Sequence, residues 1–149
     1  MTDTHWLAWA AGIIDGEGCI SLGPTSGRVQ LILHVGQVDI RMLQKLYSIF
    51  GGIIKPMKDH RPRRRAVWRW RVRGDQAAQV LKLILPWLVI KHEQAELALL
   101  SRQYMNRNGC NDPEKKAAQL WFASQVRAWK HEPSAEPPGR KESLSELKG

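Results

Sequence analysis

The stretch from Gly12 to Gly18, with the sequence Gly-Ile-Ile-Asp-Gly-Glu-Gly, follows an apolar, tryptophan-rich segment that starts at His5. The preceding residues repeat at helical spacing, and glycine readily adopts the left-handed conformations that close a helix. We therefore expect a helix that stops sharply in this stretch. The Glu17 carboxylate would lie just beyond its last turn, on an exposed tip.

The expected helix has two unlike sides. Bulky residues recur on one side, at Trp6, Trp9, Ala10, Ile13 and Ile14. Small or short residues recur on the other, at Ala8, Ala11, Gly12 and Asp15. We expect the bulky side to pack on the core and the small side to meet the same helix of a second subunit, because small residues let two backbones approach closely. Two copies of Glu17 would then meet at a symmetry axis, and paired carboxylates suggest a divalent metal.

The charge of the chain is concentrated in one segment. The 149 residues carry a formal net charge of +9, and almost all of it lies between Gly51 and Arg73, where Asp59 is the one acidic residue. A concentrated basic patch on an otherwise balanced globular chain is typical of a protein that binds a polyanion, most often nucleic acid.

The cysteines and the apolar runs give no indication of a zinc-binding, membrane-spanning or secreted protein. Cys19 and Cys110 stand far apart, without the spacing of a zinc site, so a reducing compartment fits. The longest apolar run, Leu83 to Ile90, is too short to span a bilayer, and the N-terminus lacks the pattern of a signal peptide. We expect a cytoplasmic protein without a membrane partner, or a protein of an organelle matrix if an organelle encodes it.

The order of the expected elements is mixed. After the first helix we expect a strand at Cys19 to Leu22, a turn at Gly23 to Gly27 and a strand at Arg28 to Val35. Next come a helix from Ile40 to Phe50, ended by Gly51 and Gly52, and strands at Ile53 to Met57 and Ala66 to Arg73. The remaining helices are expected from Asp75, as N-cap, to about Leu85, from Ile90 to Asn106, and from Pro113 to about Lys130. Residues 1–131 would form one domain, and 132–149 a disordered tail.

Two of these strands alternate clearly between an apolar and a polar face. Val29, Leu31, Leu33 and Val35 face one way, opposite to Arg28, Gln30, Ile32 and His34. Ala66, Trp68, Trp70 and Val72 alternate with Val67, Arg69, Arg71 and Arg73. The arginine face is either a solvated sheet surface or a nucleic-acid surface. Arginines in register repel one another unless an anion relieves them, which favours the second interpretation.

The nine residues from Ala10 to Gly18 resemble the signature of the LAGLIDADG homing endonucleases. The resemblance extends over residues 5 to about 106 and implies an α+β fold with an αββαββα core. The four-stranded antiparallel sheet of that fold forms a saddle in the DNA major groove, and here further C-terminal helices would follow. The DNA-binding residues expected on the saddle and its basic loop are Arg28, Gln30, His34, Lys55, Lys58, Arg61, Arg63, Arg64, Arg65, Arg69, Arg71 and Arg73.

The resemblance also implies a set of catalytic residues. Glu17 would bind Mg²⁺, with Mn²⁺ as a substitute, and the carbonyl of Gly16 would add a ligand. Gln37 would position the attacking water, while Arg41 and Lys91 would stabilise the phosphate. Asp15 would have a structural role at the helix end. Taken singly, Gln37 could instead be a helix-cap partner, Arg41 a surface charge at the start of a helix, and Lys91 an ordinary first-turn lysine.

The single motif predicts a homodimer, because one copy of the saddle would cut only one strand. Ala8, Ala11, Gly12 and Asp15 would form the interface, and the target would be a long, nearly palindromic duplex. The sequence leaves three uses of the same fold open. They are a site-specific endonuclease, an intron maturase that binds RNA, and a DNA-binding regulator that does not cut. The gene of an endonuclease could lie in an intron, lie in an intein or stand free. A small module that pairs with proteins through its tryptophans is a further alternative, which the clustered arginines disfavour.

Overall fold

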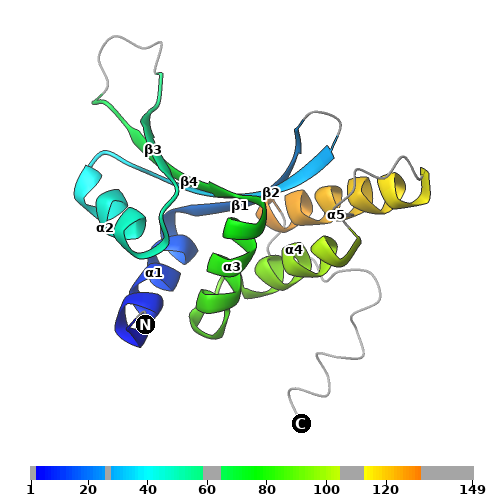
Figure 1. Ribbon diagram of the computed structural model, residues 1–149, viewed down its shortest axis with the longest axis horizontal. Coiled ribbons are helices and arrows are strands. Elements are labelled where there is room, and N and C mark those ends of the chain that lie inside the picture. The colour runs from blue at the N-terminus through cyan, green and yellow to red at the C-terminus, as the bar shows by residue number, and fades with distance from the viewer. Residues whose placement is uncertain (1–2, 26–27, 59–64, 105–112, 132–149) are drawn as a thin grey trace.

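A computed structural model describes residues 3–25, 28–58, 65–104 and 113–131. In chain order its elements are α1 (Thr4–Glu17), β1 (Gly18–Thr25), β2 (Arg28–Gln37), α2 (Ile40–Phe50), β3 (Ile53–Pro56), β4 (Trp68–Arg73), α3 (Gly74–Ile84), the short 3₁₀ helix η1 (Leu85–Trp87), α4 (His92–Tyr104) and α5 (Pro113–His131). The helices lie on one side of the sheet, and no described element covers the other side (Figure 1). This is the α+β arrangement expected from the sequence.

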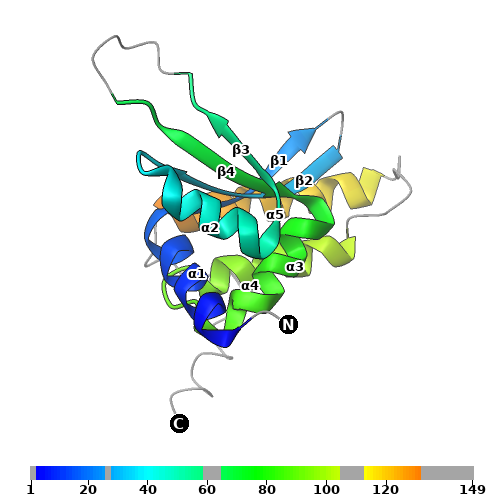
Figure 2. The same ribbon diagram turned by 60° about the vertical axis from the view of Figure 1, so that its left-hand side comes forward.

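The four strands form one antiparallel sheet in the order β1-β2-β4-β3. The two strands with clear alternation, β2 and β4, are therefore neighbours in the middle of the sheet. Figures 1 and 2 show the ends of the β1–β2 and β3–β4 hairpins rising away from the helices. The uncovered face is concave as a result.

The core lies between the sheet and the helices. Trp70 is completely buried on β4, as are Leu31, Leu33 and Val35 on β2. The helices contribute Leu7, Ala10, Ala11, Ile14, Leu43, Leu46, Ala77, Leu81, Ile84, Ala95, Ala98, Phe122 and Val126. The predicted alternation is confirmed along β2 and along β4 from Trp68 onward, because their apolar residues face this core. Ala66, predicted on the same face, is exposed and precedes the strand.

The end of α1 differs from the expectation. Glu17 is the last residue of the helix rather than a residue beyond it, and Gly18 closes the helix in an extended conformation with φ −81° and ψ 158°. Among the described glycines, a positive φ occurs at Gly51, Gly52 and Gly74. Gly18 is required for a different reason, since a Cβ there would lie 2.6 Å from the carbonyl oxygen of Ile14. Close approach, not a left-handed turn, explains this glycine.

Other element boundaries also differ. The residues expected to form the turn after β1 extend the strand, because Gly23, Pro24 and Thr25 pair with β2. Arg73, not Asp75, occupies the N-cap position of α3, and the Asp75 carboxylate accepts a hydrogen bond from Arg102 of α4. The helix expected from Ile90 starts at His92. Gly51 and Gly52 do end α2, with φ of 70° and 99°.

Within the described ranges, none of the helices combines the length and apolar character needed to cross a membrane. The expected tail at 132–149 and the end of the helix predicted to reach Asn106 lie outside the described residues.

Candidate active site and nucleic-acid interface

The uncovered face of the sheet is built from cross-strand rows of side chains. Residues paired in antiparallel strands point to the same face, so the register defines each row. Gly36 of β2, Arg69 of β4 and Lys55 of β3 form one row. The next rows are Cys19, His34, Arg71 and Ile53, then Ser21, Ile32 and Arg73, then Gly23 and Gln30, and finally Thr25 and Arg28. The concave face thus combines a basic half over β4 and β3 with a largely uncharged half over β1 and β2.

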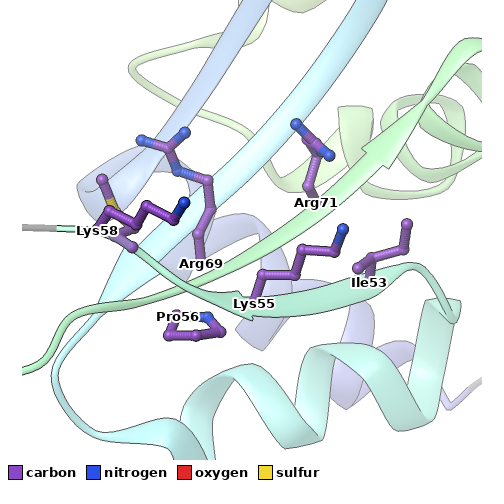
Figure 3. Close-up of a pocket in the computed structure, with 7 residues that line it drawn as sticks. Ile53, Lys55, Pro56, Lys58, Arg69 and Arg71 are labelled. Carbon is purple, nitrogen blue, oxygen red and sulfur yellow. The ribbon is translucent and has the colours of Figure 1, made fainter.

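The basic half contains a cavity of about 300 Å³ lined by Ile53, Lys55, Pro56, Met57, Lys58, Arg69 and Arg71. In Figure 3, the side chains of Lys55, Lys58, Arg69 and Arg71 rise from the same side of the β3–β4 pair, while Pro56 points away. Like charges directly opposite one another, as at Lys55 and Arg69, destabilise a sheet. A bound polyanion would relieve this repulsion.

The electrostatics of β4 also favour a bound anion on this face. Burial lowers the pKa of the Arg71 guanidinium, and the positive charges of Arg73 and Arg69 lower it further. The Nε of Arg69 is buried and has no hydrogen-bond partner among the described residues, and the same is true of the side-chain Oε1 of Gln30. Buried polar groups are normally paired. Both atoms belong to the face that the sequence predicted to bind DNA.

The core residues of β4 hold this basic row in place. Trp70 lies between Arg69 and Arg71 in the chain, and its Nε1 donates to the carbonyl oxygen of Gly51 at 2.8 Å. A Cβ at Gly52 would lie 2.7 Å from the carbonyl oxygen of Arg71 and 2.8 Å from the Val72 side chain. The two glycines let the α2–β3 connection pack closely on β4, so the strand is fixed from its core side.

The other predicted DNA-binding residues are distributed as follows. Gln30 and His34 lie half-buried on the concave face, and Lys58, Arg65 and Arg73 are exposed. The backbone of Arg28 pairs with Thr25. Arg61, Arg63 and Arg64 lie outside the described residues.

The predicted catalytic residues Glu17, Gln37 and Lys91 lie toward one end of the sheet. Gly18, next to Glu17, pairs with Val35, two residues before Gln37. Gln37 is the last residue of β2 and pairs with Trp68. Glu17 and Gly16 are both exposed, and within the described part of the chain no side chain bonds the Glu17 carboxylate.

Asp15 fixes Lys91 at this end of α1. The Asp15 carboxylate accepts hydrogen bonds from the main-chain N–H groups of Val89, at 2.8 Å, and Lys91, at 2.9 Å. The Nζ of Lys91 donates to the main-chain carbonyl oxygen of Asp15. These contacts explain why α4 starts only at His92. They also give Asp15 a structural role, as the resemblance implied.

Arg41 is held by its own neighbour. Its guanidinium donates to both carboxylate oxygens of Asp39, and its main-chain N–H donates to Oδ1, so Asp39 caps α2. Hydrogen bonds from the Arg41 side chain and then from its backbone lower the pKa of Asp39 to about 2. The Arg41 side chain is 84% exposed. It would have to leave Asp39 to reach a phosphate.

The predicted dimer face of α1 requires one correction. Ala11 is completely buried in the core of its own chain, so it cannot contact a second subunit. The pattern alone could not show this, because Ala11 has both Leu7 and Ala8 as helical neighbours, and only packing on the rest of the chain determines which side is buried. Gly12 and Gly16 are exposed, and a Cβ at either position would meet no atom within 4 Å. The small, open side of the helix therefore consists of Ala8, Gly12 and Gly16.

The described acids of one chain do not by themselves form a metal site. Within the described ranges, no group of three or more His, Cys, Asp and Glu side chains is arranged to hold a metal ion. Of the two acids at the end of α1, Asp15 is used by backbone N–H groups and Glu17 is available. A single carboxylate and a carbonyl fit a hard cation such as Mg²⁺ that keeps several waters and takes phosphate oxygens as further ligands.

The sequence-based site omitted several residues that the structure places beside it. Ser21 and Ile53 lie on the concave face, and the strand alternation that identified Gln30 would have identified them too. Val89, whose main-chain N–H binds Asp15, and Ile90, which follows it, are 79% and 70% exposed. Their exposure could not be predicted from the sequence, because they belong to an apolar run that is typical of a buried segment.

No known family model and no curated protein matches the sequence. Solved structures match well. The homing endonuclease I-CvuI in complex with its target is 24% identical with a TM-score of 0.72, over 84% of this chain and 83% of that chain. The archaeal intron-encoded homing endonuclease I-Vdi141I, complexed with DNA, is 14% identical with a TM-score of 0.69, over 94% and 90%.

A third similar structure is that of a longer chain. The LAGLIDADG meganuclease I-AabMI, bound to uncleaved DNA, is 20% identical with a TM-score of 0.64, over 88% of this chain and 50% of that chain. The strand order, the covering helices and the concave face are thus those of a known architecture. This chain has the LAGLIDADG homing endonuclease fold.

Proposed function

We propose that this protein is a site-specific DNA endonuclease that binds duplex DNA on the concave face of its sheet and hydrolyses phosphodiesters in both strands. The observation that carries the proposal is the position of an exposed carboxylate, Glu17, at one end of a concave basic sheet. A protein that only bound DNA would gain nothing from an acid there, since it would repel the phosphates. The similar structures of I-CvuI and I-Vdi141I hold DNA, which supports the same ligand here.

The active form is a homodimer. One chain supplies one saddle and one Glu17, whereas cutting both strands requires two. This chain aligns with nearly all of I-Vdi141I but with half of I-AabMI, as expected if two copies correspond to one longer chain. Ala8, Gly12 and Gly16 let two α1 helices approach closely. Exposed Val89 and Ile90 add apolar surface beside them.

The residues at the end of α1 suit metal-assisted hydrolysis. Glu17 and the Gly16 carbonyl would hold Mg²⁺, with Mn²⁺ as a substitute, and the bound ion would supply positive charge for the phosphoryl and leaving oxygens. Gln37 orients the water that attacks phosphorus. Lys91, held by Asp15, contributes positive charge near the phosphate. Arg41 joins it once its guanidinium leaves Asp39.

Cleavage of a complex duplex library tests the proposal. The full chain is incubated with a pool of randomised duplexes in Mg²⁺, and the new ends are sequenced. We expect cuts in both strands at one nearly palindromic sequence, which EDTA and Glu17→Gln abolish. Sequence-selective binding without cuts in Mg²⁺ or Mn²⁺ would overturn the nuclease proposal and indicate a regulator. Selective binding of intron RNA over duplex DNA would indicate a maturase.

A further inference from the structure

The two halves of the concave face differ in the chemistry that they offer to DNA. Arg69, Arg71 and Lys55 line the half over β4 and β3. The described side chains on the same face of β1 and of β2 from Gln30 onward include no lysine or arginine, and they are Cys19, Ser21, Gln30, Ile32 and His34. Among these described side chains, positive charge is confined to the part over β4 and β3, while Arg28, paired with Thr25, occupies the far end of β2.

Position within the sheet determines what each basic side chain can reach. β4 is an inner strand of the order β1-β2-β4-β3. When a concave sheet lies in the major groove, its inner strands face the groove floor, where the base edges are, and the hairpin ends face the phosphates. Arg69 and Arg71 are therefore placed for bases, whereas exposed Lys58 and Arg65 stand at the phosphate side.

The surroundings of the two arginines favour hydrogen bonds to bases. Arg71 is partly desolvated between His34 and Ile53, and Arg69 lies between Gly36, which has no side chain, and Lys55. The buried Nε of Arg69 has no partner among the described residues. In the major groove, guanine offers two acceptors, O6 and N7, that match the fork of an arginine. Hydrogen bonds to guanine would offset the repulsion within the row.

The spacing of the arginines sets the spacing of the bases. Two residues along an antiparallel strand are about 7 Å apart. Successive bases in one strand of B-DNA rise about 3.4 Å. Side chains two residues apart on a strand that follows the groove therefore reach bases about two steps apart.

We propose that each half of the DNA target contains two guanines about two base steps apart, one read by Arg69 and the other by Arg71. The guanines lie under β4 and β3, and the part of the half-site under Cys19, Ser21, Ile32 and His34 lacks such a contact. This inference rests on the proposed DNA binding and specifies its substrate.

Selection from a randomised duplex pool provides the first test. The full chain is used with EDTA present, so that bound DNA stays intact, and the bound duplexes are sequenced. We expect two guanines at this spacing in each half-site. Arg69→Lys keeps the charge but loses the fork, so it should lose preference at one of the two positions while binding unselected DNA normally. As the matched control, Arg65→Ala should weaken binding to all sequences and keep both preferences.

Chemical substitution in the DNA provides a second test that leaves the protein unchanged. Each guanine of the selected duplex is replaced in turn by 7-deazaguanine, which lacks the N7 acceptor. We expect a loss of affinity of about 10-fold at the two guanines under β4 and no loss at guanines elsewhere. Unchanged affinity at both positions, or an Arg69→Lys protein with both preferences intact, would overturn the inference while leaving DNA binding established. A chain that selects no duplex would overturn the proposed function itself.

Discussion

Lys91 is bound to Asp15 through two separate groups. Its main-chain N–H donates to the Asp15 carboxylate at 2.9 Å, and its Nζ donates to the Asp15 main-chain carbonyl oxygen at 2.5 Å. The carboxylate also accepts from Val89. A cation at the C-terminal end of a helix is favoured by the helix dipole. The contact joins α1 to the start of α4 and holds an ammonium group at the carbonyl of Asp15, two residues before Glu17 in the chain.

Replacing Asp15 should therefore destabilise the fold. Asp15→Ala leaves the N–H groups of Val89 and Lys91 without their acceptor, and we expect a loss of about 1–3 kcal/mol in the free energy of unfolding. Glu17→Ala is the matched control, because its exposed carboxylate should change stability by no more than about 0.5 kcal/mol. Urea unfolding of both variants measures the difference. Equal stability of the two would show that the Asp15 contacts contribute nothing.

Glu17→Gln should separate binding from cleavage. The substitution removes a metal ligand and a negative charge near the phosphates, so the cleavage rate should fall at least about 100-fold, while affinity for the selected duplex stays equal or rises. Cleavage assays in Mg²⁺ and fluorescence anisotropy in EDTA measure the two effects. If binding were lost by a folded protein, Glu17 would have a structural role instead.

Gly12→Leu should separate folding from dimerisation. The position is exposed and open in the single chain, and leucine forms helices better than glycine, so the subunit should fold at least as stably. Bulk between two α1 helices would push them apart, and a displacement of about 1 Å can cost a hundredfold in rate. We expect a folded monomer by sedimentation, with weak, salt-sensitive DNA binding and no double-strand cleavage.

Gly18→Ala is the contrasting variant for that experiment. Its Cβ would lie 2.6 Å from the Ile14 carbonyl oxygen, so it should destabilise the subunit itself. A dimeric and fully active Gly12→Leu protein would show that α1 is not the subunit interface.

Arg41→Ala should raise the pKa of Asp39 from about 2 toward its ordinary value of 3.8. The return should be incomplete, because the main-chain N–H of residue 41 still donates to the carboxylate. Since the folded-state pKa is depressed, the pairing stabilises the protein above about pH 4, and this contribution is lost as the pH falls through 2. NMR titration of the Asp39 carboxyl in both proteins checks the shift. An unchanged titration would contradict the pairing.

Much of the fold could be predicted from local patterns. The alternation along β4 identified both the core residues and the arginine row, and α2 begins and ends where its cap and glycines predicted. These signals are local, because side chains alternate every two residues along a strand and a capping side chain bonds N–H groups in the first turn of its helix.

The errors came from contacts between distant segments. Asp15 bonds residues 74 and 76 positions away, which delays α4 until His92. Ala11 and Gly12 are neighbours in a row of small residues, yet one is buried and the other exposed, because packing against the rest of the chain determines which side of α1 faces inward. Strand order likewise depends on pairing between distant segments. Periodicity within one segment cannot supply this information.

The alternation of β4 has a consequence for changing the target of the protein. Trp70 and Val72 are buried against the helices, whereas Arg69, Arg71 and Arg73 point to the opposite side of the same strand. Substitution of the three arginines removes no core contact, so new base preferences can be introduced there at little cost in stability. If the proposed function holds, the exposed face of this strand can be varied while its buried face keeps the fold, so libraries at these positions are the starting point for changing the DNA target.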